Sequence, residues 1–441
     1  MLFDPAPQSI SAATKTRAIS GEAWVALTLL TLVYALNIAD RYVLSTLIEP
    51  IKQEFGLSDS AVGFLTGTSL ALFYVTAGLP LGVLADRVNR KRMIALAVGV
   101  WSAMTTLCGL SGTFWHLLIA RIGVGVGEAG GTPPSHSMIS DYFPAKSRAF
   151  ALSVVGLGAS VGAWLGATGA GLLNDAYGWR AALMVFGLCG LPIAAVVWAL
   201  VREPARGQQD DAPQSAVITS SSLRETLTFI LNTKAVFHIM AGATALTFWG
   251  WGIVWWVPAF LSRSCALSVG QAGALMGPIH GVGGTLLMLL TVGMMLRYRN
   301  KPLSLQPRFV GWTTLLGTLS SIAVFAVHDL RFVTLALWLF IPIIYIYIGP
   351  TSGLIQNLFP PSMRAKGIAV LLFVVNIANL AIAPQLMGFC SDLLAPHLDN
   401  PQESLRYVLL AFTLTGFWAA YHYYAAGRCM NERLRPSHHK L

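Results

Sequence analysis

The chain has 441 residues, of which 55% are hydrophobic and only 11% are charged. Because a soluble domain carries about 25% charged residues, this composition excludes a water-soluble fold and predicts an integral membrane protein. The net charge of +10 does not indicate nucleic-acid binding, since the basic residues lie in short clusters between apolar segments, as in the loops of membrane proteins.

Apolar segments long enough to cross a bilayer, which takes about 20 residues per helix, recur along the whole chain. The twelve candidates fall at residues 23–48, 60–85, 92–110, 114–139, 148–173, 180–201, 235–261, 268–296, 307–327, 332–357, 365–390 and 405–427. The polar segment 202–224, rich in Pro, Gln, Asp and Ser, separates the first six from the last six. We therefore predict an all-α membrane protein with a six-helix bundle at 1–201, a cytoplasmic linker at 202–224, and a second six-helix bundle with a cytoplasmic tail at 225–441.

Short sequences recur at corresponding positions of the two halves. FPAKSRA at 143–149 precedes the fifth predicted span, and FPPSMRA at 359–365 precedes the eleventh. LSDSAVG at 57–63 and LSVGQAG at 267–273 precede the second and the eighth spans in the same way. Two parallel, pseudo-symmetric halves are typical of transporters, whose substrate site lies between the halves near the membrane midplane.

The basic residues also predict the orientation of the chain. Most lysines and arginines fall in loops on the same side as the N-terminus. The positive-inside rule therefore predicts cytoplasmic N- and C-termini in a cell membrane, the inner membrane if the source is bacterial.

The sequence contains none of the patterns that we would expect of a metalloprotein or an enzyme. The five cysteines are scattered, with no CxxC pair, so we expect no metal site. No phosphate loop or nucleophile elbow occurs, so we expect no cofactor and no enzymatic activity.

GVLADRVNRKR at 82–92 joins the second and third predicted spans. It is similar to the G-x-L-a-D-r-x-G-r-k pattern of the major facilitator superfamily, with Asn at the position where that family usually has Gly. The resemblance implies a cytoplasmic gate that comprises Gly82, Asp86, Arg87, Arg90 and, before the fifth span, Arg148. Gly82 would let two helices approach closely, and Asp86 would accept from helix amides and pair with Arg87 or Arg90. A solvated basic loop is the alternative interpretation.

LLIARIGVGVGEAGG at 117–131, in the fourth predicted span, resembles a second pattern of the same superfamily, l-x-x-x-R-x-x-q-G-x-g-x-a, with Val in place of the usual Gln. This resemblance implies that Arg121 takes part in proton coupling. The Gly-Pro signature of antiporters is absent from the fifth span. Its Gly158, Gly162 and Gly166 recur at a spacing of four residues, so we expect them to allow close helix packing.

The first third of the chain narrows the resemblance to the spinster-like branch. NIADRYVLSTLIEPIKQEFGLSDSAVGFLTG at 37–67 resembles that branch, which has Asn-x-x-Asp-Arg in the first helix and Ile-x-x-x-Phe-x-Leu-Ser-Asp before the second. Glu128, beyond the arginine of the fourth span, fits the same pattern. Spinster-like proteins move sphingolipids and lysolipids, so the resemblance implies a lipid-like substrate and proton coupling.

Four ionisable residues lie within the predicted spans: Asp40, Arg41, Arg121 and Glu128. Charges at bilayer depth are costly and mark functional sites, where they pair with one another. Asp40 and Arg41 point about 100° apart around their helix, so we expect each to find a partner on another helix, for example Asp40 or Glu128 facing Arg121.

We predict that Asp40 and Glu128 carry protons, and that Arg41 and Arg121 set their proton affinity as the bundles rock. An anionic substrate would then travel with the proton, whereas a cationic one would compete with it, so the charges leave symport and antiport both open. A buried network that only stabilises the fold is the alternative.

Two histidines fall within the spans, His136 in the fourth and His280 in the eighth. We interpret both as packing residues, with a proton path through His136 as the alternative. The second half has no charged residue inside its spans and offers aromatic and amide side chains instead. We predict a substrate cavity lined by His136, Trp255, Tyr345 and Asn376. An aromatic belt at the membrane interface is the other interpretation of the tryptophans.

Together these features predict a proton-coupled secondary transporter that moves an amphipathic, lipid-like substrate by alternating access. The expected partners are this substrate, protons and membrane lipids, and the expected functional unit is a monomer. One alternative keeps the mechanism and moves a small organic anion or a drug. The alternative from another class is a membrane receptor or sensor that binds a ligand on a transporter fold without moving it.

Overall fold

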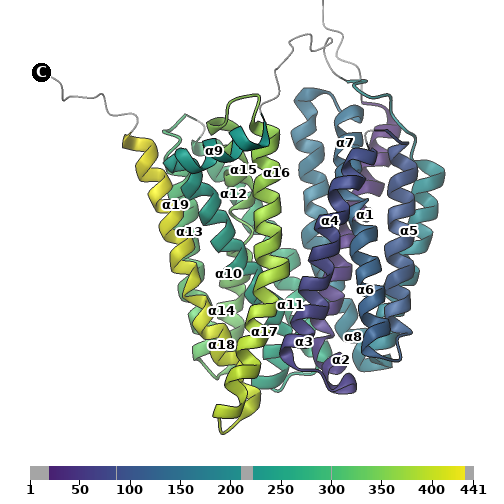
Figure 1. Cartoon of the computed structure of the whole chain (residues 1–441), viewed down its shortest axis with the longest axis vertical. Helices are drawn as coiled ribbons and strands as arrows, with labels where there is room; N and C mark the ends of the chain where they lie inside the picture. Colours follow the sequence, from purple (N-terminus) through teal and green to yellow (C-terminus); the bar gives the residue numbers. More distant parts are fainter. Residues whose placement is uncertain (1–18, 86, 210–221, 299, 433–441) are drawn as a thin grey trace, which may run out of the picture.

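The computed structural model describes residues 19–85, 87–209, 222–298 and 300–432, so Asp86 and residues 210–221 of the predicted linker lie outside it. Throughout these ranges the regular elements are helices (Figure 1). The first half contains α1 (Gly21–Thr46), α2 (Ile48–Phe55), α3 (Asp59–Gly63), the π-helix η1 (Phe64–Thr68), α4 (Ser69–Ala85), α5 (Arg90–Gly109), α6 (Phe114–Ala129), α7 (Thr132–Tyr142) and α8 (Ala145–Leu200).

The second half begins with the short α9 (Leu223–Asn232) and continues through long helices with several irregular turns. It contains α10 (Lys234–Ser264), α11 (Val269–Pro278), the π-helix η2 (Ile279–Gly284), α12 (Thr285–Tyr298), α13 (Leu305–Ala326), α14 (Leu330–Ile343), α15 (Ile348–Leu358), α16 (Arg364–Asn376), the π-helix η3 (Ile377–Ile382), α17 (Ala383–Leu394), the 3₁₀ turns η4 (Ala395–His397) and η5 (Pro401–Glu403), α18 (Ser404–Thr413) and α19 (Thr415–Glu432).

Nine helical stretches of the described chain are long and apolar enough to cross a membrane. One of them, within α8, holds two spans, because Gly178 takes a φ of 82° and interrupts the helix there. Two more spans are each built from two shorter helices, α6 with α7 and α18 with α19. Twelve membrane-crossing segments result, which confirms the predicted all-α membrane fold.

The repeated sequences LSDSAVG and LSVGQAG start corresponding helices in the two halves. Ser58 accepts a hydrogen bond from the backbone N–H of Ala61 at the start of α3, and Ser268 accepts one from Gln271 at the start of α11. A side-chain oxygen at this position satisfies an amide that the helix leaves unpaired. The repeat therefore encodes the same helix start in the second and the eighth spans.

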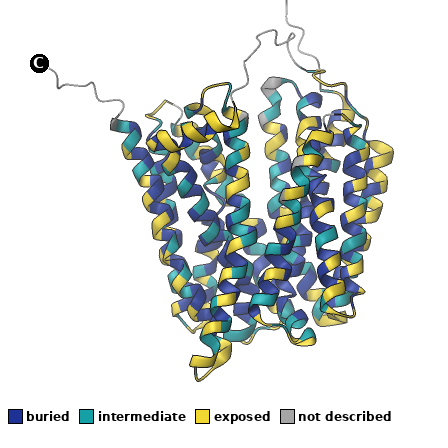
Figure 2. Cartoon of the chain, viewed as in Figure 1, coloured by how far each residue is buried: buried dark blue, intermediate teal, exposed yellow. Residues whose placement is uncertain are grey.

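Buried side chains form two separate hydrophobic cores. One core uses residues between 23 and 201, and the other uses residues between 230 and 430 together with Ile48, Val62 and Ala167. In Figure 2 buried residues fill the interior of each half, while exposed residues cover the outside. The outside is apolar, as Leu289 and Leu290 of α12 show with exposures of 58% and 63%. Apolar surface on this scale requires a lipid environment.

Glycines of the fifth span bring α8 into direct backbone contact with α1. A Cβ added at Gly158, Gly162 or Gly166 would come within 2.8 Å of a backbone oxygen of α1. Any larger residue would force the two helices apart, so the prediction that these glycines allow close packing is confirmed.

The two halves meet at one end of the molecule. We call the end where α1 begins and residues 201–209 lie the linker end, and the opposite end, with α2, α3 and α18, the far end (Figure 1). Two seams join the halves: α8 packs against α11 and η2, and α3 and η1 pack against α17 and η3. Towards the linker end the ribbons of the two halves diverge (Figure 1).

Candidate functional site

The charged residues of the first span lie in the middle of α1 and pair with other helices. Asp40 accepts from Nη1 of Arg121 in α6 at 3.1 Å and from the hydroxyl of Thr105 in α5 at 2.5 Å. Arg41 donates from Nε and Nη2 to Oε2 of Glu128 at 2.9 and 2.7 Å. Asp40, Arg41, Arg121 and Glu128, which we call the ion-pair cluster, therefore form two pairs that each cross from one helix to another.

This ion-pair cluster is deeply buried and only partly hydrogen-bonded. Arg121 and Glu128 are both 0% exposed. Within the described part of the chain, Nε and Nη2 of Arg121 and Oε1 of Glu128 have no hydrogen-bond partner. An unpaired buried polar atom costs about 1–3 kcal/mol. The two Arg121 nitrogens can therefore gain free energy by donating to water or to part of a substrate, and Oε1 of Glu128 can do so by accepting from water or by binding a proton.

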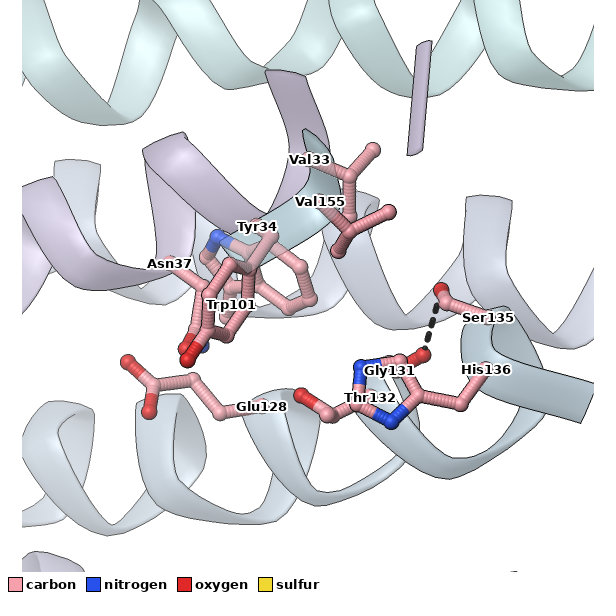
Figure 3. Close-up of a pocket in the computed structure, with 10 residues that line it drawn as sticks. All are labelled: Val33, Tyr34, Asn37, Trp101, Glu128, Gly131, Thr132, Ser135, His136 and Val155. Atoms are coloured by element: carbon pink, nitrogen blue, oxygen red, sulfur yellow. Dashed lines mark hydrogen bonds between the residues drawn. The ribbon is translucent and has the colours of Figure 1, made fainter. Parts of the chain in front are cut away.

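A narrow cavity of about 10 Å³ reaches Glu128 (Figure 3). Its walls include Asn37 of α1 and Thr132 and His136 of α7, and Figure 3 shows Glu128, Thr132 and His136 following one another along one side. The volume is about that of a single water molecule. Because His136 is exposed, the cavity connects a buried carboxyl with an exposed imidazole.

A larger cavity of about 200 Å³ lies between the two halves. From the first half it is lined by α1, including Arg41, and by Ala159 of α8. From the second half it is lined by Trp251, Trp255, Tyr345, Tyr347, Asn376 and Asn379. Three of the predicted cavity residues, Trp255, Tyr345 and Asn376, thus lie together here, whereas His136 lies at the smaller cavity.

Some residues of the site were not predicted from the sequence. Tyr34 and Tyr42 line the larger cavity, and Thr105 donates to Asp40. Tyr34, Ile38 and Arg41 all line this cavity from one face of α1, and their helical spacing is a signal that could have identified Tyr34. Thr105 offers no such signal, because its role depends on where α5 packs.

The contacts that the structure describes for the predicted gate residues Arg90 and Arg148 lie within the first half and the start of the linker. Among the described residues, a Cβ added at Gly82 would find no atom within 4 Å, so the expected close approach of two helices is not present in that part of the chain. The reason is that the halves diverge at this end. Arg87 is exposed, and Asp86 lies outside the described residues. Arg148 donates from Nε to the backbone oxygen of Ser140 at 2.8 Å, within the first half.

Arg90 holds the beginning of the linker against the first half. Its guanidinium is buried, pairs with Asp141 of α7, and donates to Glu203 at 2.7 Å and to the backbone oxygen of Pro204 at 3.0 Å. Within the described residues its carboxylate partners are therefore Asp141 and Glu203. Asp86, the partner predicted for it, lies outside them. The linker thus begins as an ordered segment fixed by Arg90.

We expect Arg90→Gln to destabilise the linker end. The substitution removes the common partner of Asp141 and Glu203, and loss of one member of a buried ion pair costs about 3–5 kcal/mol. Because Glu203 is partly exposed, the loss of stability should lie near the lower end of this range. Thermal unfolding of the detergent-solubilised protein measures it, with Arg87→Gln at the exposed neighbouring arginine as the control. Equal unfolding midpoints for the two variants would show that the buried contacts contribute nothing.

Buried charges also close the far end. Arg263 of α10 donates to both carboxylate oxygens of Asp59 at 2.8 Å and to Glu49 of α2 at 2.7 Å. Asp392 of α17 accepts from the backbone N–H groups of Asp59 and Ser60 at 2.8 and 2.7 Å. All of these contacts join one half to the other, so charge-assisted hydrogen bonds hold the far end closed.

A similar contact lies on the other seam, where α8 packs against α11. Asp175, near the end of the fifth span, accepts from the hydroxyl of Ser268 at the start of α11 at 2.6 Å. Gly171 precedes Asp175 by four residues, as Gly388 precedes Asp392, and each glycine packs against backbone of the opposite half. Each half thus ends a span with Gly-x-x-x-Asp, and each aspartate contacts the start of a helix in the other half.

Two helical cores closed against each other at one end, with a buried ion-pair cluster beside a cavity between them, are the parts of a secondary transporter. Residues 30–384 match the family model of the Major Facilitator Superfamily. The chain belongs to the major facilitator superfamily, and within it to the spinster type, as its similarities to individual proteins indicate.

The chain is 30% identical over 407 residues to an MFS-type efflux pump of Mycolicibacterium smegmatis, with 90% of this chain and 92% of the relative covered. It is 26% identical over 402 residues to the sphingosine-1-phosphate transporter SPNS2 of Mus musculus, with 87% and 73% covered. The crystal structure of a bacterial homolog of the human lysosomal transporter Spinster, in an inward-facing and unoccupied conformation, matches with a TM-score of 0.83 at 27% identity. That match covers 96% of this chain and all of the other.

Proposed function

We propose that the protein is a proton-coupled secondary transporter that moves an amphipathic, lipid-like substrate by alternating access. The observation that carries this proposal is the position of Arg41, which lines the cavity between the halves and also pairs with Glu128. An anionic head group in the cavity would compete with Glu128 for the guanidinium. A buried carboxylate that loses its cation takes up a proton, so one side chain links substrate binding to proton binding.

The charge of the ion-pair cluster supports the same coupling. With both acids ionised, the two carboxylates and two guanidinium groups sum to zero. Protonation of Asp40 or Glu128 leaves the cluster at +1, which favours an anionic ligand beside it. A cationic substrate would instead be favoured by an ionised carboxylate, so substrate and proton would compete for that carboxylate.

The small cavity at Glu128 supports a route for the proton. Oε1 of Glu128 has no partner among the described residues, and the cavity has room for one water between this carboxyl and His136. We infer that protons reach Glu128 from the linker end through His136 and a single water molecule.

The larger cavity supports an amphiphile as the cargo. Its first wall carries Arg41, and its second wall is aromatic, which suits a charged head group and an apolar chain respectively. At about 200 Å³ it is smaller than the roughly 300–1,000 Å³ of a drug-sized site. It therefore accommodates a head group with the first part of a chain. The mouse relative, whose name gives sphingosine-1-phosphate as its cargo, supports this class of substrate.

We also propose that the protein works as a monomer in the cell membrane, with both termini in the cytoplasm. The cavity is formed by the two halves of one chain, so a second copy is not required. The basic residues Arg87, Arg90 and Arg202 lie at the linker end, which the positive-inside rule assigns to the cytoplasm. In this orientation the structure is closed towards the outside.

Flux in proteoliposomes with an imposed pH gradient tests the proposed function. Three cargoes are compared: a single-chain phospholipid, a small organic anion without a chain, and a cationic dye. We expect the gradient to accelerate lipid flux over that in protein-free liposomes, and a protonophore to remove the acceleration. Saturable lipid binding without flux would refute transport and favour a receptor, and flux that ignores the gradient would refute proton coupling.

Efflux of a small organic anion or a drug is the second candidate. It is favoured by the 30% identity to the relative named an MFS-type efflux pump. The same experiment separates the two candidates, because this one requires gradient-driven flux of the chain-free anion or the dye in preference to the lipid.

We expect Trp251→Leu to reduce the apparent affinity for a long-chain cargo. Trp251 lines the cavity and packs edge-on against Tyr345 at 5.0 Å between ring centroids, so its loss removes part of the apolar wall. The KM for the lipid should rise about tenfold, the scale of one aromatic contact with its buried area. The KM for the chain-free anion should change much less. Trp312→Leu, on the exposed outer face, is the matched control, and equal changes for both cargoes would contradict the assignment.

A further inference from the structure

Three aromatic side chains join the two halves beside the larger cavity. Nδ1 of His280, in η2, lies 3.0 Å from the hydroxyl oxygen of Tyr345 and 3.4 Å from that of Tyr42 in α1. The Tyr42 ring also packs edge-on against the imidazole, with 4.7 Å between centroids. Tyr42 belongs to the first half, and the other two residues belong to the second. The sequence alone favours a packing role for His280, whereas in the structure His280 lies at the contact between the two halves.

The backbone is irregular on both sides of this contact in the second half. η2 is a π-helix between α11 and α12, and residues 344–347 interrupt the helix between α14 and α15. Such irregular turns are frequent at functional sites and are tolerated at membrane depth where they line a cavity. Gly284 lets η2 approach the Tyr345 ring, because a Cβ there would lie 3.0 Å from it.

A single imidazole nitrogen thus faces two hydroxyl groups. Nδ1 carries either one proton or one lone pair, so it makes one good hydrogen bond at a time. His280 is fully buried, and its Nε2 has no partner among the described residues. The hydrogen bonds that orient the ring therefore come from Tyr42 and Tyr345.

Each tyrosine belongs to a different part of the proposed mechanism. Tyr42 directly follows Arg41 in α1, and both residues line the cavity. Tyr345 lines the same cavity from the opposite side and packs against Trp251. A shift of α1 that accompanies a change in the ion-pair cluster moves Tyr42 relative to His280, while Tyr345 stays in the same half as His280.

We propose that His280 is a positioning residue for transport. It exchanges its Nδ1 hydrogen bond between Tyr42 and Tyr345, so the orientation of the aromatic wall of the cavity depends on the state of the ion-pair cluster. The inference rests on the proposed proton-coupled transport. With the far end closed, His280 reaches both hydroxyls. When the halves separate at the far end, Tyr42 withdraws and His280 bonds to Tyr345 alone, which fixes the Tyr345 ring in one orientation.

A double-mutant cycle tests this inference. Tyr42→Phe, His280→Gln and the double variant are reconstituted, and proton-driven uptake is measured beside cargo exchange without a gradient. We expect each single substitution to lower the ratio of uptake to exchange about tenfold, the scale of one buried hydrogen bond. The double variant should lie no lower than the worse single one. His238→Gln is the control, since His238 pairs with His422 away from the cavity.

Losses that multiply in the double variant would overturn the inference, as would equal losses of uptake and exchange. If His280→Gln does not fold, Tyr42→Phe with Tyr345→Phe gives the same cycle by removing only hydroxyl groups. Failure of the proposed function can be told apart from failure of this inference, because in the former case flux through the wild-type protein would not depend on the pH gradient.

Discussion

Asp40→Asn and Glu128→Gln are each expected to abolish the part of substrate flux that depends on a pH gradient. An amide neither releases nor takes up a proton, so the cavity can no longer exchange H⁺ as it changes sides. Exchange of substrate without a gradient should continue, because each amide keeps a hydrogen-bond acceptor for its arginine. Proteoliposome uptake with and without the gradient measures both quantities on the same preparation.

The two variants are also expected to differ from the wild-type protein in their affinity for the substrate in a direction that depends on the charge of the substrate. Either amide leaves the ion-pair cluster at +1, the charge that it carries when one acid is protonated. An anionic amphiphile should therefore bind at least as tightly to Asp40→Asn as to the wild-type protein, even though it is no longer driven by the gradient. Weaker binding would indicate that the carboxylate holds the substrate directly, as expected for a cationic cargo.

A matched control removes a carboxylate outside the cluster. Asp329 caps α14 by accepting from the backbone N–H of Arg331, and Asp329→Asn should leave the pH dependence of flux intact. Gradient-driven flux that survives in both Asp40→Asn and Glu128→Gln would refute the assignment of these residues as proton carriers. The cluster would then be a network that only stabilises the fold.

The sequence identifies which charged residues form this site better than it predicts which of them pair with each other. Charged residues stand out in apolar spans, so Asp40, Arg41, Arg121 and Glu128 are identified by composition alone. Which acid meets which arginine depends on helix rotation and crossing angle, and single-sequence periodicity does not fix these. The pairing of Arg41 with Glu128 and of Asp40 with Arg121 therefore emerges only from the packed structure.

Contacts between distant segments are invisible to sequence reasoning for a similar reason. Glu203 belongs to a polar stretch that predicts only a linker, yet it reaches the guanidinium of Arg90 in the buried start of α5. Gly82 fits a pattern for close helix approach, yet whether the approach exists depends on the conformational state of the two halves. The seam contacts of His280 likewise require knowledge of how η2 faces α1. Predictions based on local spacing, such as the serine caps and the glycines of α8, need no such knowledge.

At the far end, Arg263→Gln is expected to shift the protein towards a state that is open there. Arg263 pairs with Asp59 and Glu49 across the halves, and its side chain is only 7% exposed. Loss of one member of a buried pair costs about 3 kcal/mol or more. If that cost falls on the closed state alone, the population of the open state rises roughly 100-fold.

Distances between spin labels measure this shift. Gln53 of α2 and Gln402 of η5 are exposed and line the same cavity at the far end from opposite halves, so labels there separate when it opens. The five native cysteines are first replaced. We expect a longer distance to dominate in Arg263→Gln and a shorter one in the otherwise unchanged protein.

Two further variants separate gating from a general loss of stability. Arg180→Gln breaks an exposed ion pair with Glu54 at the same end, but within the first half. Hydrogen bonds from Arg180 and Trp179 lower the pKa of Glu54, so this pair is also fully charged at neutral pH, yet its loss should leave the distances unchanged. Lys52 also pairs with Asp59 at 2.5 Å. The double variant Arg263→Gln with Asp59→Asn removes one cation and one carboxylate, so the net charge of this group stays as in the wild-type protein, and the double variant should restore much of the closed population. The excess of carboxylate over cation, rather than the missing arginine itself, would then be what drives the far end open, and identical distances for all variants would refute a gate at Arg263.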